Sequence, residues 1–196
     1  MKPVRVGVVV AGLVALPALA ALKAGDKAPD FSTKAALAGK EIAFSLKDAL
    51  KRGPVVVYFY PSAFTGGCNL EAHTFSENRE KFDAAGASII GVSQDSVERL
   101  KAFSADPQYC AGKVAVASDP DGSIAKSYNL NKVGVPAGLK DTRGDAIDHE
   151  LTERTTFVVT KDGKIAATLS SADDKITPAQ HVEKALAAVQ QLGSKR

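Results

Sequence analysis

The feature that most constrains the fold is a continuous apolar run, Val55–Tyr60, which leads directly into Pro-Ser-Ala-Phe-Thr-Gly-Gly-Cys and ends at Cys68. A run rich in β-branched and aromatic residues predicts a buried strand. Beyond it, Leu70, Phe75 and Phe82 recur at helical spacing, so we expect a helix over about 67–84. The first turn of a helix offers free amide groups and the positive end of the helix dipole, and both stabilise an anion. The junction therefore favours a thiolate nucleophile at Cys68; the alternative, a buried structural thiol, fits a helix start flanked by glycines poorly.

Strand-like and helix-like segments alternate along the rest of the chain. The expected strands cover 55–59, 88–92, 114–117, 155–159 and 164–169, and the expected helices cover 67–84, 96–104, 123–128 and 178–192. This alternation predicts an α/β fold, in which a central β-sheet is flanked by helices. Asp162-Gly163 is a strong hairpin signal between the last two strands, so these strands should be antiparallel and the sheet mixed. Thr177 is placed to cap the final helix.

Two regions show weaker patterns. Residues 31–35 and 41–46 could form a short hairpin around Gly39-Lys40, followed by one helical turn over 47–51. Residues 129–153 contain several glycines and little periodicity. We interpret the second region as a long irregular loop over the active face, because such loops in compact domains tend to be functional or mobile. A surface excursion without a role is the alternative.

The N-terminal residues predict a secretory signal peptide over residues 1–20. Two basic side chains precede an apolar run from Val6 to Leu16, and small residues lead to a cleavage site after Ala20. The apolar run is short for a membrane span, although an uncleaved leader could still anchor the domain at a membrane. We therefore expect one globular domain over residues 21–196, located in the periplasm or secreted.

The charge balance argues against a nucleic-acid partner. The chain has 25 lysine and arginine residues against 22 acidic residues. Loss of the leader removes Lys2 and Arg5, which leaves 23 positive side chains (25 − 2) against 22 negative ones. The sequence contains no basic block and no basic stripe with interleaved aromatic residues, which are the usual signs of a nucleic-acid surface.

The spacing of proline, three residues, threonine, two residues and cysteine after a strand resembles the peroxidatic signature of peroxiredoxins. Further segments resemble the bacterioferritin-comigratory, PrxQ-type branch of that family, in the same order along the chain: Gly25–Phe31, Gly91–Ser96, Ser118–Gly122, Arg154–Val159 and Lys161–Ile165. The resemblance covers nearly the whole chain after the leader. It implies a thioredoxin-like fold of the AhpC/TSA type, in agreement with the mixed sheet predicted above. It also implies a thiol peroxidase that reduces hydrogen peroxide and alkyl hydroperoxides, needs no metal or organic cofactor, and is recycled by a thioredoxin-like or other dithiol reductant.

The family pattern implies a role for each matching position. Cys68 would be the peroxidatic nucleophile, Thr65 would present its hydroxyl to sulfur and peroxide, and Pro61 would shield the pocket. Arg154, at the start of a predicted strand, would bring guanidinium donors to the site. Taken alone, Thr65 could be a turn residue and Arg154 a surface arginine paired with a neighbouring glutamate. Glu71 matches the glutamate that follows the nucleophile in the family, but a place on the helix surface is equally consistent with its position.

Cys110 resembles the resolving cysteine of one PrxQ-type subgroup, because it follows a predicted helix and precedes a predicted strand. Another subgroup carries that cysteine five residues after the nucleophile, where this chain has His73. The resemblance implies that Cys68, once oxidised to sulfenic acid, condenses with Cys110 to a disulfide. The two Cα atoms must come within about 7 Å for that bond, so we expect the first turn after Cys68 to unwind. A buried free cysteine beside Tyr109 is the alternative.

Other functions compete with this hypothesis. A thioredoxin-like thiol–disulfide oxidoreductase would need a Cys-x-x-Cys pair, which the chain lacks. A redox sensor or copper-binding module could use both cysteines as a switch or as ligands, but one methionine and no cysteine–histidine cluster make soft-metal ligands scarce. The three histidines, His73, His149 and His181, show no metal spacing, and we interpret them as ordinary polar residues. His73 has one alternative role, because as an imidazolium near Cys68 it could favour the thiolate. The protein could be a monomer or a weak homodimer.

Overall fold

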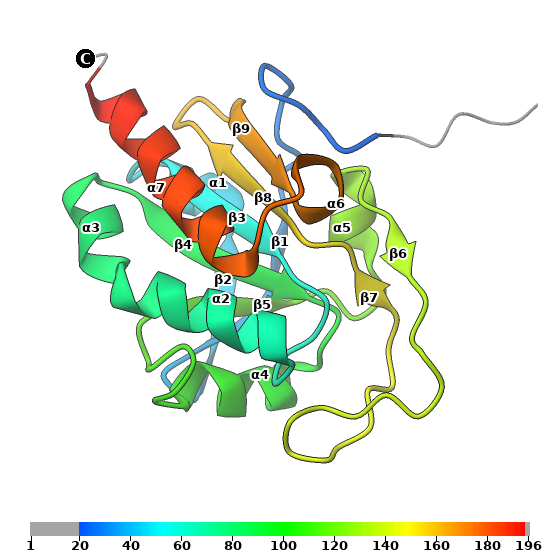
Figure 1. Ribbon diagram of the computed structural model, residues 1–196. Helices are drawn as coiled ribbons and strands as arrows, with labels where there is room; N and C mark the ends of the chain where they lie inside the picture. Colours follow the sequence, from blue (N-terminus) through cyan, green and yellow to red (C-terminus); the bar gives the residue numbers. More distant parts are fainter. Residues whose placement is uncertain (1–19, 195–196) are drawn as a thin grey trace, which may run out of the picture.

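The structure is a computed structural model that describes residues 20–194 (Figure 1). Its centre is a seven-stranded sheet in the order β2-β1-β5-β4-β3-β8-β9. β3 (Val55–Phe59), β4 (Ser88–Ser93) and β5 (Ala115–Ser118) are parallel, whereas β8 (Thr155–Val159) is antiparallel to β3 and β9 (Ile165–Ser170) is antiparallel to β8. β1 (Ser32–Leu37) and β2 (Lys40–Ser45) form a hairpin at the other edge. The predicted mixed sheet and both predicted hairpins are confirmed.

Helices cover both faces of the sheet (Figure 1). One layer contains α2 (Gly66–Glu77), α3 (Arg79–Ala84), α4 (Val97–Ala105) and α7 (Pro178–Gly193), and the other contains α1 (Leu46–Leu50) and α5 (Ser123–Ser127). β3 supplies both cores because its side chains alternate: Val56 and Tyr58 pack into the first core, whereas Val57 and Phe59 pack into the second. Because β3 is buried on both faces, its sequence is apolar at every position. The final helix begins as predicted, with Thr177 in a capping box.

The single helix predicted over 67–84 is wrong, because the structure has two helices there. α2 ends at Glu77 and α3 begins at Arg79, and Asn78 between them has φ −95° and ψ 6°. The Asn78 side chain donates to the carbonyl oxygen of Thr74 at 2.9 Å, which competes with continuation of the backbone ladder. Apolar side chains of both helices face the same core, so the periodicity continues across the break and conceals it.

The region 129–153 contains more structure than the irregular loop that was expected. β6 (Lys132–Val133) and β7 (Leu151–Thr152) form a short antiparallel pair. Residues 134–150 between these strands form an irregular segment, which we call the excursion (Figure 1). A short helix, α6 (Ser171–Asp174), was also not predicted.

The predicted leader lies outside the described residues, except for Ala20. Within residues 20–194, we find no helix with the length and apolar character needed to cross a membrane.

Candidate active site

Cys68 lies in the first turn of α2, and its side chain is nearly inaccessible, at 2% exposed. Thr65 occupies the N-cap position with an extended backbone, so Cys68 lies at the end of the helix where the amide groups have no intrahelical partners. Gly67 leaves room beside the sulfur: a Cβ atom at this position would lie 3.2 Å from Nη2 of Arg154. A larger residue would therefore crowd the guanidinium that contacts Cys68.

Arg154 joins the thiol to a buried carboxylate. Its Nη2 donates to Sγ of Cys68 at 3.2 Å, and its Nη1 pairs with Oε2 of Glu71. The antiparallel register pairs Phe59 with Thr155, so the start of β8 lies beside the end of β3 and the loop that leads to Cys68. The surface alternative does not hold, because the neighbouring glutamates have other partners: Glu150 pairs with Lys132, and Glu153 accepts from Asn131.

Glu71 is fully buried, so the expected alternative of a place on the helix surface is wrong. Burial raises the pKa of Glu71 to about 7, although Arg154 opposes this shift. Its Oε1 has no hydrogen-bond partner among the described residues. Burial alone would lower the pKa of Arg154, but the charges of Glu71 and Cys68 beside it hold that pKa above its ordinary value. Arg154 is therefore a permanent cation whose planar fork is fixed by two partners.

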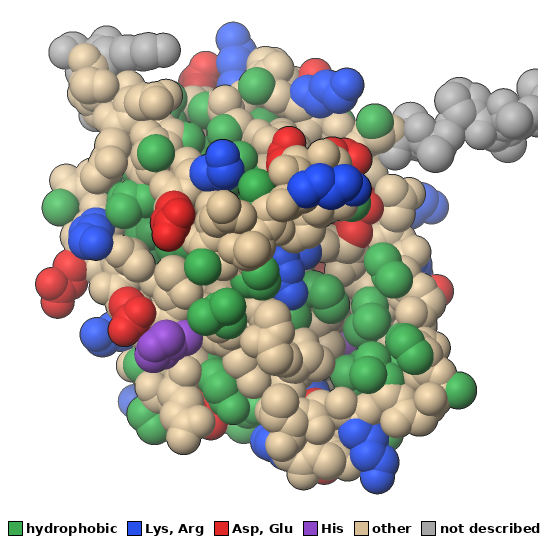
Figure 2. All heavy atoms as spheres, in the orientation of Figure 1, with side chains coloured by type: hydrophobic (Ala, Val, Ile, Leu, Met, Phe, Trp, Pro, Cys, Tyr) green, Lys and Arg blue, Asp and Glu red, His purple; other side chains and the backbone are tan. Residues whose placement is uncertain are grey.

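Pro61 and Thr65 line a hollow next to the thiol loop. The Thr65 hydroxyl donates to the carbonyl oxygen of Ser62 at 2.8 Å, and no hydrogen bond within the described part of the chain joins it to Cys68. Its oxygen can still accept a hydrogen bond from a ligand. The hollow has a volume of about 310 Å³, and its apolar wall includes Leu139, Ile147 and Leu151. Figure 2 shows hydrophobic side chains gathered on this side of the molecule, where Figure 1 places β6, β7 and the excursion.

Cys110 is a fully buried free thiol between α4 and β5. Burial raises the pKa of this thiol well above its usual range. Cys110 belongs to the same core as Cys68, and the ring of Phe64, from the thiol loop, packs edge-on against Tyr109. Both thiols are free and buried in this core, and their pairing as a disulfide stays a prediction.

Two of the three histidines are not the ordinary polar residues that were expected. His181 is buried and bonds through its two ring nitrogens to the hydroxyls of Thr156 and Ser171, each at 2.9 Å. Burial lowers the pKa of His181 to about 4, and the charge of Arg154 acts in the same direction. His149 belongs to a buried network around Asp95, whereas His73 contacts Glu77 on the surface of α2. Within residues 20–194, no group of three or more His, Cys, Asp or Glu side chains is arranged to hold a metal ion.

Comparison with known proteins places this chain among the thiol-dependent peroxidases. The profile of the AhpC/TSA family matches residues 24–168, and the chain belongs to that family. The chloroplastic peroxiredoxin Q of Sedum lineare is 32% identical over 158 residues, which cover 76% of this chain and 75% of the relative. The chloroplastic peroxiredoxin Q of Populus jackii is 32% identical over 168 residues, which cover 86% of this chain and 68% of the relative.

Solved structures agree with the family assignment. The crystal structure of peroxidoxin BcpB from Mycobacterium tuberculosis matches with a TM-score of 0.71 and 29% identity, over 87% of this chain and 97% of that one. A structure of peroxiredoxin Q from Xanthomonas campestris matches with a TM-score of 0.63 and 28% identity, over 82% of this chain and 90% of that one. The predicted thioredoxin-like fold is confirmed, and the family uses peroxide substrates and thioredoxin-type reductants.

Proposed function

We propose that this protein reduces hydrogen peroxide and alkyl hydroperoxides at Cys68, with Cys110 as the resolving cysteine and a thioredoxin-like dithiol as the reductant. The observation that carries the proposal is the 3.2 Å contact between Arg154 Nη2 and Cys68 Sγ in a site nearly closed to water. A permanent cation beside a sulfur at a helix N-terminus stabilises the thiolate that attacks peroxide.

In the first step, the Cys68 thiolate attacks one peroxide oxygen. The S–O bond forms as the O–O bond breaks, and the second oxygen leaves as hydroxide or alkoxide and takes up a proton. Arg154 can support the charge that develops on the oxygens, a kind of interaction whose loss costs about 10²–10³-fold in rate. The Thr65 oxygen can accept the hydrogen bond of the peroxide O–H, which orients the substrate.

In the second step, the Cys68 sulfenic acid condenses with the Cys110 thiol, so that a disulfide forms and water leaves. Thiol–disulfide exchange with an external dithiol then returns both cysteines to the reduced state. We expect the first turn of α2, which carries Cys68, to unwind in this step, because the two Cα atoms must come within about 7 Å of each other.

The hollow beside Pro61 and Thr65 supports the inclusion of alkyl hydroperoxides. Its wall includes three aliphatic side chains of the excursion and β7, which would accept the alkyl part of a substrate while Thr65 receives the peroxide group.

We further propose that the domain is exported, with residues 1–20 as a cleaved leader, on the strength of the basic, apolar and small-residue pattern at the N-terminus. The intact mass of the protein purified from a periplasmic fraction tests this proposal, because cleavage predicts a chain that begins at Ala21. Recovery of the full-length mass from that fraction would support the uncleaved anchor instead.

The decisive experiment is the intact mass of the reduced protein after one equivalent of hydrogen peroxide, followed by peptide mapping under non-reducing conditions. We expect the loss of two hydrogens and a bridge between Cys68 and Cys110, and no reaction in Cys68→Ser. A stable gain of one oxygen on Cys68 would mean that an external thiol resolves the intermediate. An unchanged mass would overturn the proposed peroxidase function and favour the sensor or copper-binding hypothesis.

A further inference from the structure

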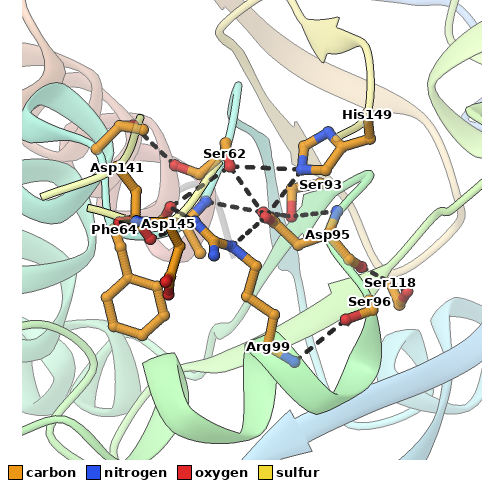
Figure 3. Close-up of polar contacts among 12 residues, drawn as sticks. Ser62, Phe64, Ser93, Asp95, Ser96, Arg99, Ser118, Asp141, Asp145 and His149 are labelled. Carbon is orange, nitrogen blue, oxygen red and sulfur yellow. Dashed lines mark hydrogen bonds and ion pairs between the residues drawn. The ribbon is translucent and has the colours of Figure 1, made fainter. Parts of the chain in front are cut away.

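A buried polar network holds the loop that precedes Cys68 (Figure 3). Its centre is the fully buried carboxylate of Asp95, which follows β4. Asp95 Oδ1 accepts from Ser62 Oγ, Arg99 Nε and His149 Nε2, each at 2.9 Å, and Oδ2 accepts from Ala63 N and Ser93 Oγ, each at 2.7 Å. Two of these donors, Ser62 and Ala63, belong to the loop Pro61–Thr65. Asp95 therefore anchors that loop although it contacts neither cysteine through a hydrogen bond.

The excursion takes part in the same network. Arg99 Nη2 donates to Asp141 Oδ2 at 2.6 Å and to the carbonyl oxygen of Ala63 at 3.0 Å, so one guanidinium joins the excursion to the loop. His149 Nε2 faces the Asp95 carboxylate, and its Nδ1 faces the carbonyl oxygen of Glu150 at 2.8 Å. Because carboxylate and carbonyl oxygens only accept, both ring nitrogens carry protons and His149 is a cation.

A second set of contacts holds Phe64, which lies between the anchored residues and Thr65. The backbone N–H and the hydroxyl of Thr142 both donate to the carbonyl oxygen of Phe64, at 2.8 and 2.9 Å. The guanidinium carbon of Arg143 lies 3.4 Å from the centroid of the Phe64 ring. Phe64 has φ 60°, in the left-handed region that a bulky side chain occupies only when its surroundings impose it.

We propose that Asp141, Thr142, Arg143 and His149 form a clasp that positions the Pro61–Thr65 loop for attack of Cys68 on peroxide. The inference rests on the proposed function, and it assigns the clasp a positioning role, since none of its members contacts the thiol through a hydrogen bond. Attack on peroxide uses the folded loop, in which Arg154 contacts Cys68. A weaker clasp leaves the loop less well placed and therefore slows this attack.

The test compares two variants, Thr142→Val and Arg143→Ala, with the wild type. Thr142→Val has nearly the same shape but loses the hydroxyl donor to Phe64, and Arg143→Ala loses the cation over the ring. We expect each to slow the first oxidation of Cys68 by about three- to tenfold, as followed by quench-flow and intact mass. Hydrogen–deuterium exchange of residues 61–66 should quicken by a similar factor.

Matched controls separate positioning from general damage to the fold. Thr142→Ser keeps the hydroxyl and should restore most of the wild-type oxidation rate and exchange. Arg52→Ala removes an exposed arginine of another region and should change neither. An unchanged oxidation rate, or unchanged exchange of residues 61–66, in both clasp variants would overturn the proposal. If the wild type does not react with peroxide, the proposed function fails, and the exchange of residues 61–66 still decides whether the clasp holds the loop.

Discussion

Replacement of Arg154 by lysine should slow oxidation of Cys68 by hydrogen peroxide about 10- to 100-fold while the protein stays folded. Arginine holds Cys68 with one nitrogen and Glu71 with another, and its side chain is only 11% exposed. The lysine ammonium is a single point charge on a flexible stem, so it cannot reproduce both contacts in this geometry. It still gives the buried Glu71 a counter-ion.

The magnitude follows from the strength of the hydrogen bond between the guanidinium and the sulfur. A hydrogen bond to a charged group contributes about 1.5–3 kcal/mol, and each 1.36 kcal/mol of barrier is about tenfold in rate. Removal of the hydrogen bond to sulfur therefore corresponds to about 10- to 150-fold. Arg154→Ala is a less specific probe, because it leaves the Glu71 carboxylate buried without a partner, which typically destabilises a protein by about 3–5 kcal/mol.

The assay is the second-order rate constant for oxidation of Cys68 over a range of peroxide concentrations. The chain has no tryptophan, so quench-flow with intact mass is preferable to intrinsic fluorescence. Arg52→Lys is the matched control, since Arg52 is exposed and precedes β3, at the opposite end of that strand from the thiol loop. A wild-type rate constant in a folded Arg154→Lys protein would refute the idea that the two-nitrogen contact drives the reaction.

Other perturbations probe Cys110, Gly91, the buried His181 and the partly buried His149. Cys110→Ser should leave the first oxidation intact but stop turnover with a dithiol reductant, and continued turnover in a coupled assay would remove Cys110 from the cycle. Gly91→Ala should lower the free energy of unfolding by about 1–3 kcal/mol in chemical denaturation, because its Cβ would lie 2.5 Å from Cζ of Tyr58; an unchanged midpoint would contradict this. The unfolding free energy should fall as pH drops from about 6.5 towards 4, because the folded pKa of His181 is about 4 and the unfolded chain then binds the extra proton. Hydrogen bonding to Asp95 and to the Glu150 carbonyl raises the pKa of His149 despite burial, so the unfolding free energy should also fall as pH rises through that folded pKa. In a plot of unfolding free energy against pH, His181→Asn should reduce the fall on the acidic side, and His149→Gln should reduce the fall at higher pH.

Patterns within short stretches predicted most of the elements, because the interactions that create those patterns are local or general. A strand buried on both faces reads as a continuous apolar run, as Val55–Tyr60 does, and the Asp162-Gly163 turn joins two antiparallel strands. The break at Asn78 escaped prediction because the core-facing periodicity is the same on both sides of it. The short β6–β7 pair escaped because two-residue strands leave no periodic signal.

The sequence by itself predicted the class of fold, the family and the position of Cys68 at the start of a helix, because the motif around Cys68 and the other matching segments are each contiguous in the chain. Only the tertiary structure decided the partners of the buried charges. Arg154 meets Glu71 across 83 positions, and His149 meets Asp95 across 54. These pairs depend on the register of β8 against β3 and on how the excursion folds back over the thiol loop. A charged residue carries no local sign of the partner it will find, so a glutamate on the helix surface and a buried glutamate look alike until the chain is folded.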